Sequence, residues 1–143
     1  MGRILAIDYG LKRTGLAVTD PLKIIATGLE TIETTSLIAF LKSYFQKENV
    51  EEVVIGMPKR LNNEDSEIAP QVRKFVELFK TTFLNKPIFL ADERYTSSMA
   101  HAAMLEGGMK RKDRRVKGNV DRISATLILQ NYMMGRKGTL DGL

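Results

Sequence analysis

Residues 3–19 read RILAIDYGLKRTGLAVT, two apolar runs joined by a turn that contains glycine. Arg3 to Asp8 is a short apolar run that ends in an acid, which is typical of a buried strand. Leu16 to Thr19 forms a second apolar run. Between the two runs, Gly10 and Gly15 permit positive φ or a close approach of the backbone. The tight link predicts that the two strands are antiparallel neighbours in one sheet.

The rest of the chain indicates alternating strands and helices. Ile24 to Ile32 is expected to complete an antiparallel meander, and Thr34-Thr35-Ser36 offers caps for a helix beginning at Leu37. Further on we expect a strand at 52–56, a helix with apolar positions from 72 to 83, a strand at 87–91, a short helix at 97–106 and a final helix at 119–134. The sequence thus predicts an α/β fold with a five-stranded mixed sheet, three antiparallel strands and then two parallel ones, flanked by helices.

Length and composition limit the class of protein. The 143 residues fit one domain, 1–143, and the apolar (43%) and charged (27%) shares are ordinary for a globular protein. No run approaches the roughly 20 apolar residues that a bilayer needs, and Asp8 comes too early for a signal peptide. The absence of cysteine excludes disulfides and thiolate metal sites. We therefore expect a cytoplasmic protein that does not enter membranes.

Positive charge is concentrated in one segment. The net charge is +5, and the run from residue 110 to 117, KRKDRRVK, holds six cations in eight residues. Such a run attracts polyanions through counterion release from phosphates, which favours nucleic acid as the partner. A solvated loop that aids solubility is the alternative. We expect residues 110–118 to form a mobile basic loop and residues 135–143 to be a frayed tail.

Carboxylates follow two of the predicted strands. Asp8 ends the first strand, and Asp92-Glu93 follows the strand at 87–91. In a sheet with parallel strands, ligands bind beyond the carboxyl ends of those strands, so these acids are expected at one rim. Asp121, in the first turn of the last helix, could bring a third carboxylate there. Clustered carboxylates suit Mg²⁺ or Mn²⁺, and two such ions can activate water and stabilise the leaving oxygen in phosphodiester hydrolysis.

Each acid also has a purely structural interpretation. Asp8 could cap its turn, Asp92 could cap the following helix, and Asp121 could favour the helix dipole. Their joint placement favours the metal hypothesis. Lys12 and Arg13 add cations beside Asp8, and Lys59 closes the strand end Gly56-Met57-Pro58-Lys59 with another cation suited to a phosphate.

These motifs together resemble the YqgF (RuvX) family of the RNase H-like superfamily. The resemblance runs from Ile4 to about Tyr132 and rests on four elements. They are Asp8-x-Gly10-x-x-Arg13-x-Gly15-x-Ala17, Gly56-x-Pro58, Asp92-Glu93-Arg94-x-Thr96-Ser97 and Asp121-x-x-Ser124-Ala125-x-x-Ile128-Leu129-Gln130. The chain departs from the family pattern at Met57, Asn62-Asn63 and Tyr95, and none of these is an expected ligand.

The resemblance implies a nuclease with an RNase H-like fold. It implies that Asp8, Glu93 and Asp121 are the catalytic, metal-binding acids, with Mg²⁺ or Mn²⁺ as cofactor. It also implies that Arg13, Arg94 and the basic run contact phosphates; the run's cations are Lys110, Arg111, Lys112, Arg114, Arg115 and Lys117. The implied role is maturation of the 5′ end of pre-16S rRNA, with resolution of Holliday junctions as the alternative.

One geometric difficulty follows from the expected strand order. The strand at 52–56 should lie next to the first strand, and it ends in Gly56 with no acid. Glu93 would then stand two strand spacings, about 10 Å, from Asp8. A two-metal site therefore requires the long Glu93 side chain and the sheet twist to narrow that gap.

Other functions are also compatible with parts of the pattern. An Asp-x-Gly turn occurs in actin-like ATPases, but those enzymes close two such domains around a nucleotide, and this chain has residues for one. A non-catalytic nucleic-acid-binding domain is a second alternative, which the presence of all three acids disfavours. Junction resolution would require a symmetric dimer with two sites. We expect RNA as the partner, or branched DNA, and a monomer or weak homodimer.

Overall fold

The computed structural model describes residues 2–57, 68–92 and 117–141, with side chains at 2–56, 68–91 and 122–134. Its frame is a five-stranded sheet in the order β3-β2-β1-β4-β5. The strands are β1 (Arg3–Asp8), β2 (Arg13–Thr19), β3 (Ala26–Glu33), β4 (Val50–Met57) and β5 (Ile88–Asp92). β1, β2 and β3 pair antiparallel, whereas β1, β4 and β5 run parallel. The predicted mixed sheet is confirmed.

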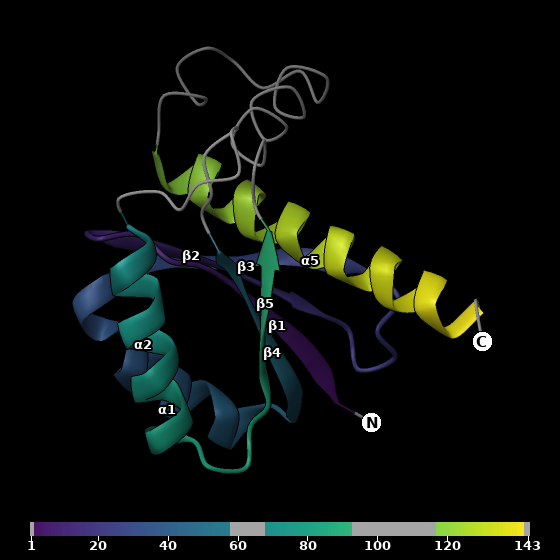
Figure 1. Ribbon diagram of the computed structural model, residues 1–143, viewed down its shortest axis with the longest axis horizontal. Helices are drawn as coiled ribbons and strands as arrows, with labels where there is room; N and C mark the ends of the chain where they lie inside the picture. The colour runs from purple at the N-terminus through teal and green to yellow at the C-terminus, as the bar shows by residue number, and fades with distance from the viewer. Residues whose placement is uncertain (1, 58–67, 93–116, 142–143) are drawn as a thin grey trace.

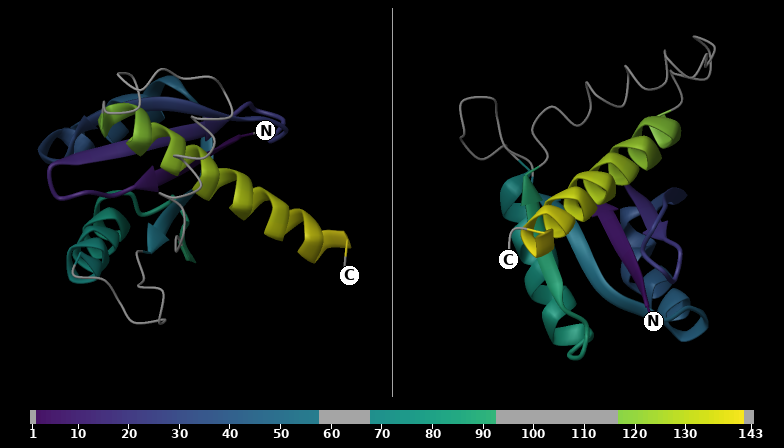
Figure 2. Two further views of the ribbon diagram at one scale, coloured as in Figure 1. Left: turned by 90° about the horizontal axis from the view of Figure 1, so that it is seen from above. Right: turned by 90° about the vertical axis from the view of Figure 1, so that its right-hand side faces the viewer.

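Helices cover both faces of this sheet (Figure 1, Figure 2). The 3-10 turn η1 (Thr34–Ser36) leads into α1 (Leu37–Lys47), which lies on one face beside α2 (Ala69–Thr82). α5 (Lys117–Asp141) crosses the opposite face diagonally. Its first half passes over Gly28 of β3, and its second half reaches Glu52 of β4 through Tyr132. None of the helices in the described ranges is long and apolar enough to cross a membrane.

The alternating side chains of β1 contribute to two apolar layers. Leu5 and Ile7 pack with α1 and α2; the buried residues of these helices in that layer are Leu37, Leu41, Ala69, Val72, Phe75, Val76 and Phe79. Ile4 and Ala6 face α5, where they pack with Ala125, Ile128 and Leu129. Because successive strand residues point to opposite faces, Asp8 shares the α5 side of β1 with Ile4 and Ala6.

Several element boundaries differ from those predicted. β2 begins at Arg13 rather than at Leu16, because its ladder with β3 extends to the pair Arg13–Glu33. α5 begins at Lys117, inside the predicted basic loop, and continues to Asp141 through the predicted frayed tail. Once a helix is formed, each further residue adds one hydrogen bond, and no proline follows Met134 to stop it. The helix predicted at 97–106 lies outside the described residues.

The predicted caps of the first helix are also corrected. Thr34-Thr35-Ser36 forms η1, and Ser36, at the start of α1, makes no side-chain capping bond. The hydroxyl of Thr34 instead bonds across the sheet to Gly10. A side-chain hydroxyl that is hydrogen-bonded to another segment is not available to cap its own helix. The prediction that Thr34 caps this helix was therefore wrong.

Candidate functional site

Asp8 stands at the carboxyl end of β1, in a row of very small residues. It pairs with Gly15 of β2 on one side. On the other side the parallel register Ile7–Ile55 brings Gly56 of β4 level with it, and Gly56 pairs with Ala91 of β5. Across these four strands Asp8 therefore carries the only side chain in the row that is larger than a methyl group. The neighbouring strands therefore add no bulky side chain beside its carboxylate.

The Asp8 turn (residues 8–13) joins β1 to β2 in a tight conformation. A Cβ atom at Gly10 would lie 2.2 Å from the carbonyl oxygen of Arg13, a distance that real side chains do not adopt. Glycine is therefore required at this position for steric reasons. On the other side of β1, the ring of Tyr9 packs against Phe75 of α2, with 5.3 Å between ring centroids.

Thr34 holds the Asp8 turn from outside it. Its backbone N–H donates to the carbonyl of Lys12 at 3.0 Å, and its hydroxyl donates to the carbonyl of Gly10 at 2.6 Å. The hydroxyl of the buried Thr14 lies 2.9 Å from the Thr34 hydroxyl. The sequence pattern did not indicate either threonine as part of the site. The bond from Thr34 to Gly10 joins residues 24 positions apart, and no local pattern marks it.

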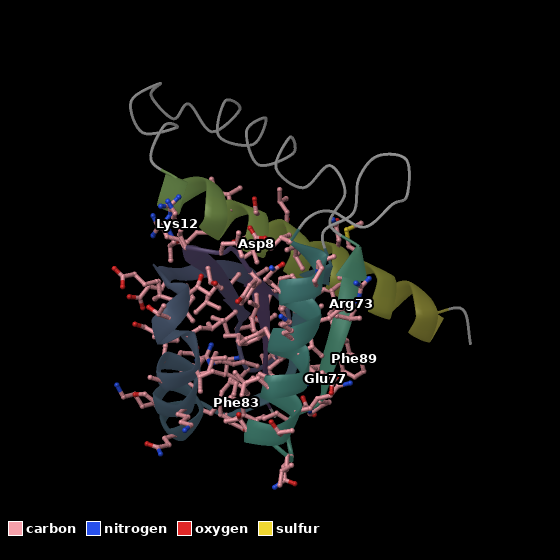
Figure 3. The ribbon with its side chains drawn as sticks, turned by 60° about the vertical axis from the view of Figure 1, so that its left-hand side comes forward. Asp8, Lys12, Arg73, Glu77, Phe83 and Phe89 are labelled. Atoms are coloured by element: carbon pink, nitrogen blue, oxygen red, sulfur yellow. The ribbon has the colours of Figure 1, made fainter. Side chains whose placement is uncertain are left out.

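Two of the predicted phosphate-binding cations lie beside Asp8. Lys12 is exposed at the tip of the turn, and Figure 3 shows it with Asp8 at the end of the sheet beneath the first turns of α5. Arg13 is half-buried at the start of β2. Alternation along β2 puts Arg13 on the same face as Ala17, which packs toward α5. Asp8, Lys12 and Arg13 thus gather at one rim.

The other predicted site residues are placed less completely. Glu93 follows β5 in the chain and lies outside the described residues, as do Lys59, Arg94 and the basic run's Lys110, Arg111, Lys112, Arg114 and Arg115. Asp121 and Lys117 are described by backbone alone, in the first turns of α5. The order β1-β4-β5 confirms that β4 separates the Asp8 strand from the strand preceding Glu93.

Within the described ranges, no group of three acidic or histidine side chains is close enough to hold a metal ion. Of the three acids predicted as ligands, Asp8 alone has its side chain in these ranges.

The Asp20 turn (residues 20–25) lies at the opposite end of the sheet and uses its acid structurally. The Asp20 carboxylate accepts from the backbone amides of Leu22 at 3.2 Å, Ile24 at 2.8 Å and Ile25 at 2.7 Å. The bond from the Ile25 amide is the main cause that lowers the pKa of Asp20. Lys23 takes the left-handed conformation that the turn needs, with φ of 59°.

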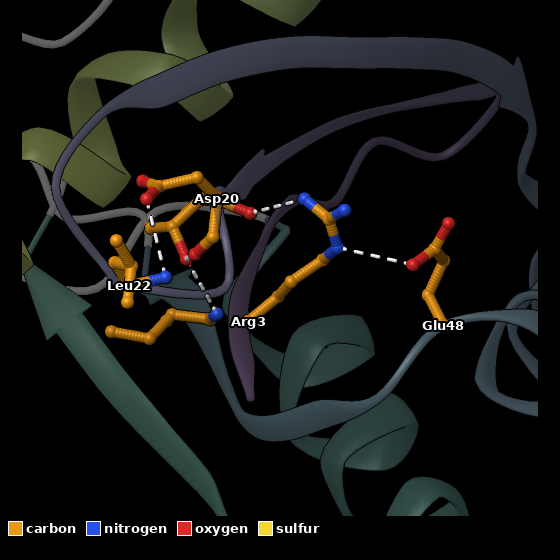
Figure 4. A network of polar contacts seen from close by, with 6 residues as sticks. Arg3, Asp20, Leu22 and Glu48 are labelled. Atoms are coloured by element: carbon orange, nitrogen blue, oxygen red, sulfur yellow. Dashed lines mark hydrogen bonds and ion pairs between the residues drawn. The ribbon is translucent and has the colours of Figure 1, made fainter. Parts of the chain in front are cut away.

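Arg3 ties this end of the sheet together (Figure 4). Its guanidinium donates to the carbonyl of Thr19 at 2.9 Å and to Glu48 at 3.2 Å. Nearby under α5, the buried Glu52 accepts a 2.7 Å bond from the hydroxyl of Tyr132, whose pKa is raised by burial. The described acids at this end thus have structural partners, and the candidate site is the Asp8 rim.

Comparisons with known proteins place the chain among nucleic-acid enzymes. The family model described as "RuvX: Holliday junction resolvase" matches residues 2–135. Relatives from Amoebophilus asiaticus, Phocaeicola vulgatus and Flavobacterium psychrophilum are 50%, 51% and 53% identical, over 96%, 96% and 93% of this chain and 97%, 99% and 97% of their own lengths. Each is named "Putative pre-16S rRNA nuclease".

The fold has a solved counterpart. The structure "T. thermophilus RuvC in complex with Holliday junction substrate" matches with a TM-score of 0.58 at 19% identity, covering 97% of this chain and 98% of that one. At this identity the match speaks for the fold alone, and it confirms the RNase H-like fold expected from the sequence.

Proposed function

Because this chain belongs to the RuvX family, we propose that it is a nuclease that hydrolyses phosphodiester bonds with the help of divalent metal ions. The observation that carries the proposal is the position of Asp8. It ends a parallel strand at the carboxyl rim, where open sheets of this kind bind their ligands. Its neighbours in the adjoining strands, Gly15, Gly56 and Ala91, carry no side chain larger than a methyl group.

The residues proposed to hold Mg²⁺ or Mn²⁺ are Asp8, Glu93 and Asp121. Carboxylate oxygens are the donors that these hard cations prefer, and the small neighbours of Asp8 fit a hydrated ion. Position 121 precedes Ser124 and Ala125 by three and four residues, and both of these are buried. The helical repeat therefore supports a place for Asp121 on the sheet-facing side of α5. When bound, such ions supply an activated water and charge stabilisation of the leaving oxygen.

The cations of the Asp8 rim are proposed to bind and orient the phosphate backbone. Arg13 can engage two phosphate oxygens at once through its planar guanidinium, whereas the exposed Lys12 acts as a point charge. The basic run at 110–117 adds long-range attraction for a polyanion. Binding of the backbone by the cations beside Asp8 would hold the scissile phosphate over the carboxylate.

The substrate that we propose is the 5′ end of pre-16S rRNA. The relatives that are about half identical over nearly their whole lengths carry a name that specifies this precursor. The proposal includes a cytoplasmic location and a two-metal mechanism. Binding of the ions by all three acids is tested by the substitutions at Asp8, Glu93 and Asp121 described below.

Resolution of Holliday junctions is the second candidate, since the family description specifies it and the fold matches a resolvase. It would require two active sites related by a twofold axis, because a junction is cut on two strands. Binding of nucleic acid without cleavage is the remaining alternative.

A direct comparison of substrates tests these candidates. The purified protein is incubated with a 5′-extended 16S precursor and with a four-way DNA junction, each with Mg²⁺, Mn²⁺ or chelator. Metal-dependent cutting of the precursor, absent with chelator, is the expected result. Paired cuts in the junction with an intact precursor would favour resolution instead. Tight binding of either substrate without cutting would reject the nuclease.

A further inference from the structure

The Asp8 turn is held by a short chain of hydrogen bonds that starts in η1. A carbonyl can only accept, so the 2.6 Å contact between Thr34 and Gly10 uses the single hydroxyl hydrogen of Thr34. The 2.9 Å contact between the Thr14 and Thr34 hydroxyls must then have Thr14 as its donor. Each bond polarises the next in such a chain, which strengthens the grip on Gly10.

The Thr34 backbone makes a second hydrogen bond to the turn, two residues after Gly10. Its N–H donates to the carbonyl of Lys12 at 3.0 Å. Leu11 lies between these two carbonyls. Its side chain is 64% exposed, so burial of this side chain does little to hold the turn in place. The turn cannot relax inward either, because Gly10 is already packed against the Arg13 carbonyl. Thr34 therefore holds the backbone that carries Lys12 at two points.

We propose that Thr34 is a positioning residue for the nuclease reaction, an inference that rests on the proposed function. It does not touch substrate. By fixing the backbone on both sides of Leu11, it holds Lys12 and Arg13 at the places from which they contact the phosphates next to Asp8. Thr14 supports Thr34 by donating to its hydroxyl.

The expected effect is on orientation rather than on attraction. Removing the Thr34 hydroxyl leaves both cations and their charge in place, so the encounter with RNA is preserved. It loosens the turn, and misplacement of positioning groups by about 1 Å can lower a reaction rate by as much as 100-fold. The loss of one neutral hydrogen bond corresponds to roughly a tenfold effect or less. We therefore expect kcat to fall roughly tenfold and KM to change by less than about twofold.

The test compares three variants of the full chain. Thr34→Val keeps the shape and removes the hydroxyl, whereas Thr34→Ser restores it. Thr82→Val is the matched control, because the Thr82 hydroxyl also donates to a backbone carbonyl, that of Leu78 at 2.7 Å, at the far end of α2. For each variant, kcat and KM on the 5′-extended precursor, amide hydrogen exchange and the thermal unfolding midpoint are measured.

The expected result is faster exchange of the turn amides and lower kcat in Thr34→Val, with both restored in Thr34→Ser and unchanged in Thr82→Val. The proposal is overturned if Thr34→Val exchanges and cuts like the wild type. It is also overturned if kcat in all three variants merely follows the loss of stability. A wild-type protein that cuts no RNA would reject the proposed function. Unchanged amide exchange of the Asp8 turn in Thr34→Val would separately reject the role of Thr34 in holding that turn.

Discussion

Two turns of this sheet begin with an aspartate, and their backbones are held by different groups. In the Asp20 turn the carboxylate accepts three backbone amides of its own loop, so the acid makes the turn. In the Asp8 turn the backbone is held by Thr34, which reaches it from the start of η1. The Asp20 turn is thus supported from within its own loop. The Asp8 turn has an additional support from a neutral side chain outside it, at the rim where ligands of such sheets bind.

The contrast also explains what each turn presents to solvent. The Asp20 turn exposes the apolar side chains of Leu22, Ile24 and Ile25. The Asp8 turn presents the cations Lys12 and Arg13 beside an acid, together with the exposed Leu11. An anionic backbone is attracted to the second surface and gains nothing from the first. The following predictions test this difference, beginning with the largest expected effect.

Substitution of the proposed ligands should separate the two turns most sharply. Asp8→Asn, Glu93→Gln and Asp121→Asn are each expected to lower cleavage by about a thousandfold, because losing an ion's charge stabilisation costs about 4 kcal/mol of barrier. Asp20→Asn keeps an acceptor and should cut within about twofold of the wild type. Single-turnover rates on the 5′-extended precursor measure this. Equal losses at Asp8 and Asp20 would mean that both act through folding.

The shape of the Asp8 turn should matter next. Gly10→Ala forces a methyl group against the Arg13 carbonyl, so we expect a loss of about 1–3 kcal/mol in the free energy of unfolding. Cleavage by the folded fraction should fall by roughly 10- to 100-fold.

Gly28→Ala is the matched control for this change, since its new Cβ would meet Thr126 only at 3.4 Å. Its effect on unfolding should stay within about 0.5 kcal/mol. Denaturant unfolding and cleavage are measured side by side. A Gly10→Ala protein as stable and as active as Gly28→Ala would refute the steric requirement.

The smallest expected effect is the loss of the stability contributed by Asp20 at acidic pH. The backbone amides, that of Ile25 first, hold the pKa of Asp20 below its ordinary value of 3.8. A carboxyl with a lowered pKa stabilises the fold above its ordinary pKa and loses that contribution as pH falls through the lower, folded value. The gap in thermal midpoint between wild type and Asp20→Ala should therefore be full at neutral pH and shrink below pH 3.8. A gap that is independent of pH would show that the charge contributes nothing.

Much of this arrangement could be predicted from the sequence. The uninterrupted apolar runs that became β1 and β4 specified the buried parallel strands, and the tight glycine turn specified the antiparallel β1–β2 pair. With the strand order, these runs fixed the rim on which Asp8 stands. The cations Lys12 and Arg13 were found because they adjoin Asp8 in the chain.

The part that could not be predicted depends on contacts between distant segments. Thr34 looked like a helix cap, since nothing local indicates a bond to Gly10. Likewise, Glu52 lies in an apolar strand, and its partner Tyr132 is 80 residues away. Sequence patterns indicate how a residue affects its own helix or strand. The partners of the Thr34 and Tyr132 hydroxyls depend instead on how β3 and α5 pack on the sheet.

The metal is expected to bind at the Asp8 rim and not at the other acids of the sheet. Titration with Mn²⁺ followed by NMR tests this without substrate, because the bound paramagnetic ion broadens the signals of nearby amides. We expect the amides of Asp8, Gly15 and Gly56 to broaden first, and Asp8→Asn to abolish this effect. Broadening that centres on residues 20–25, or that persists unchanged in Asp8→Asn, would contradict it.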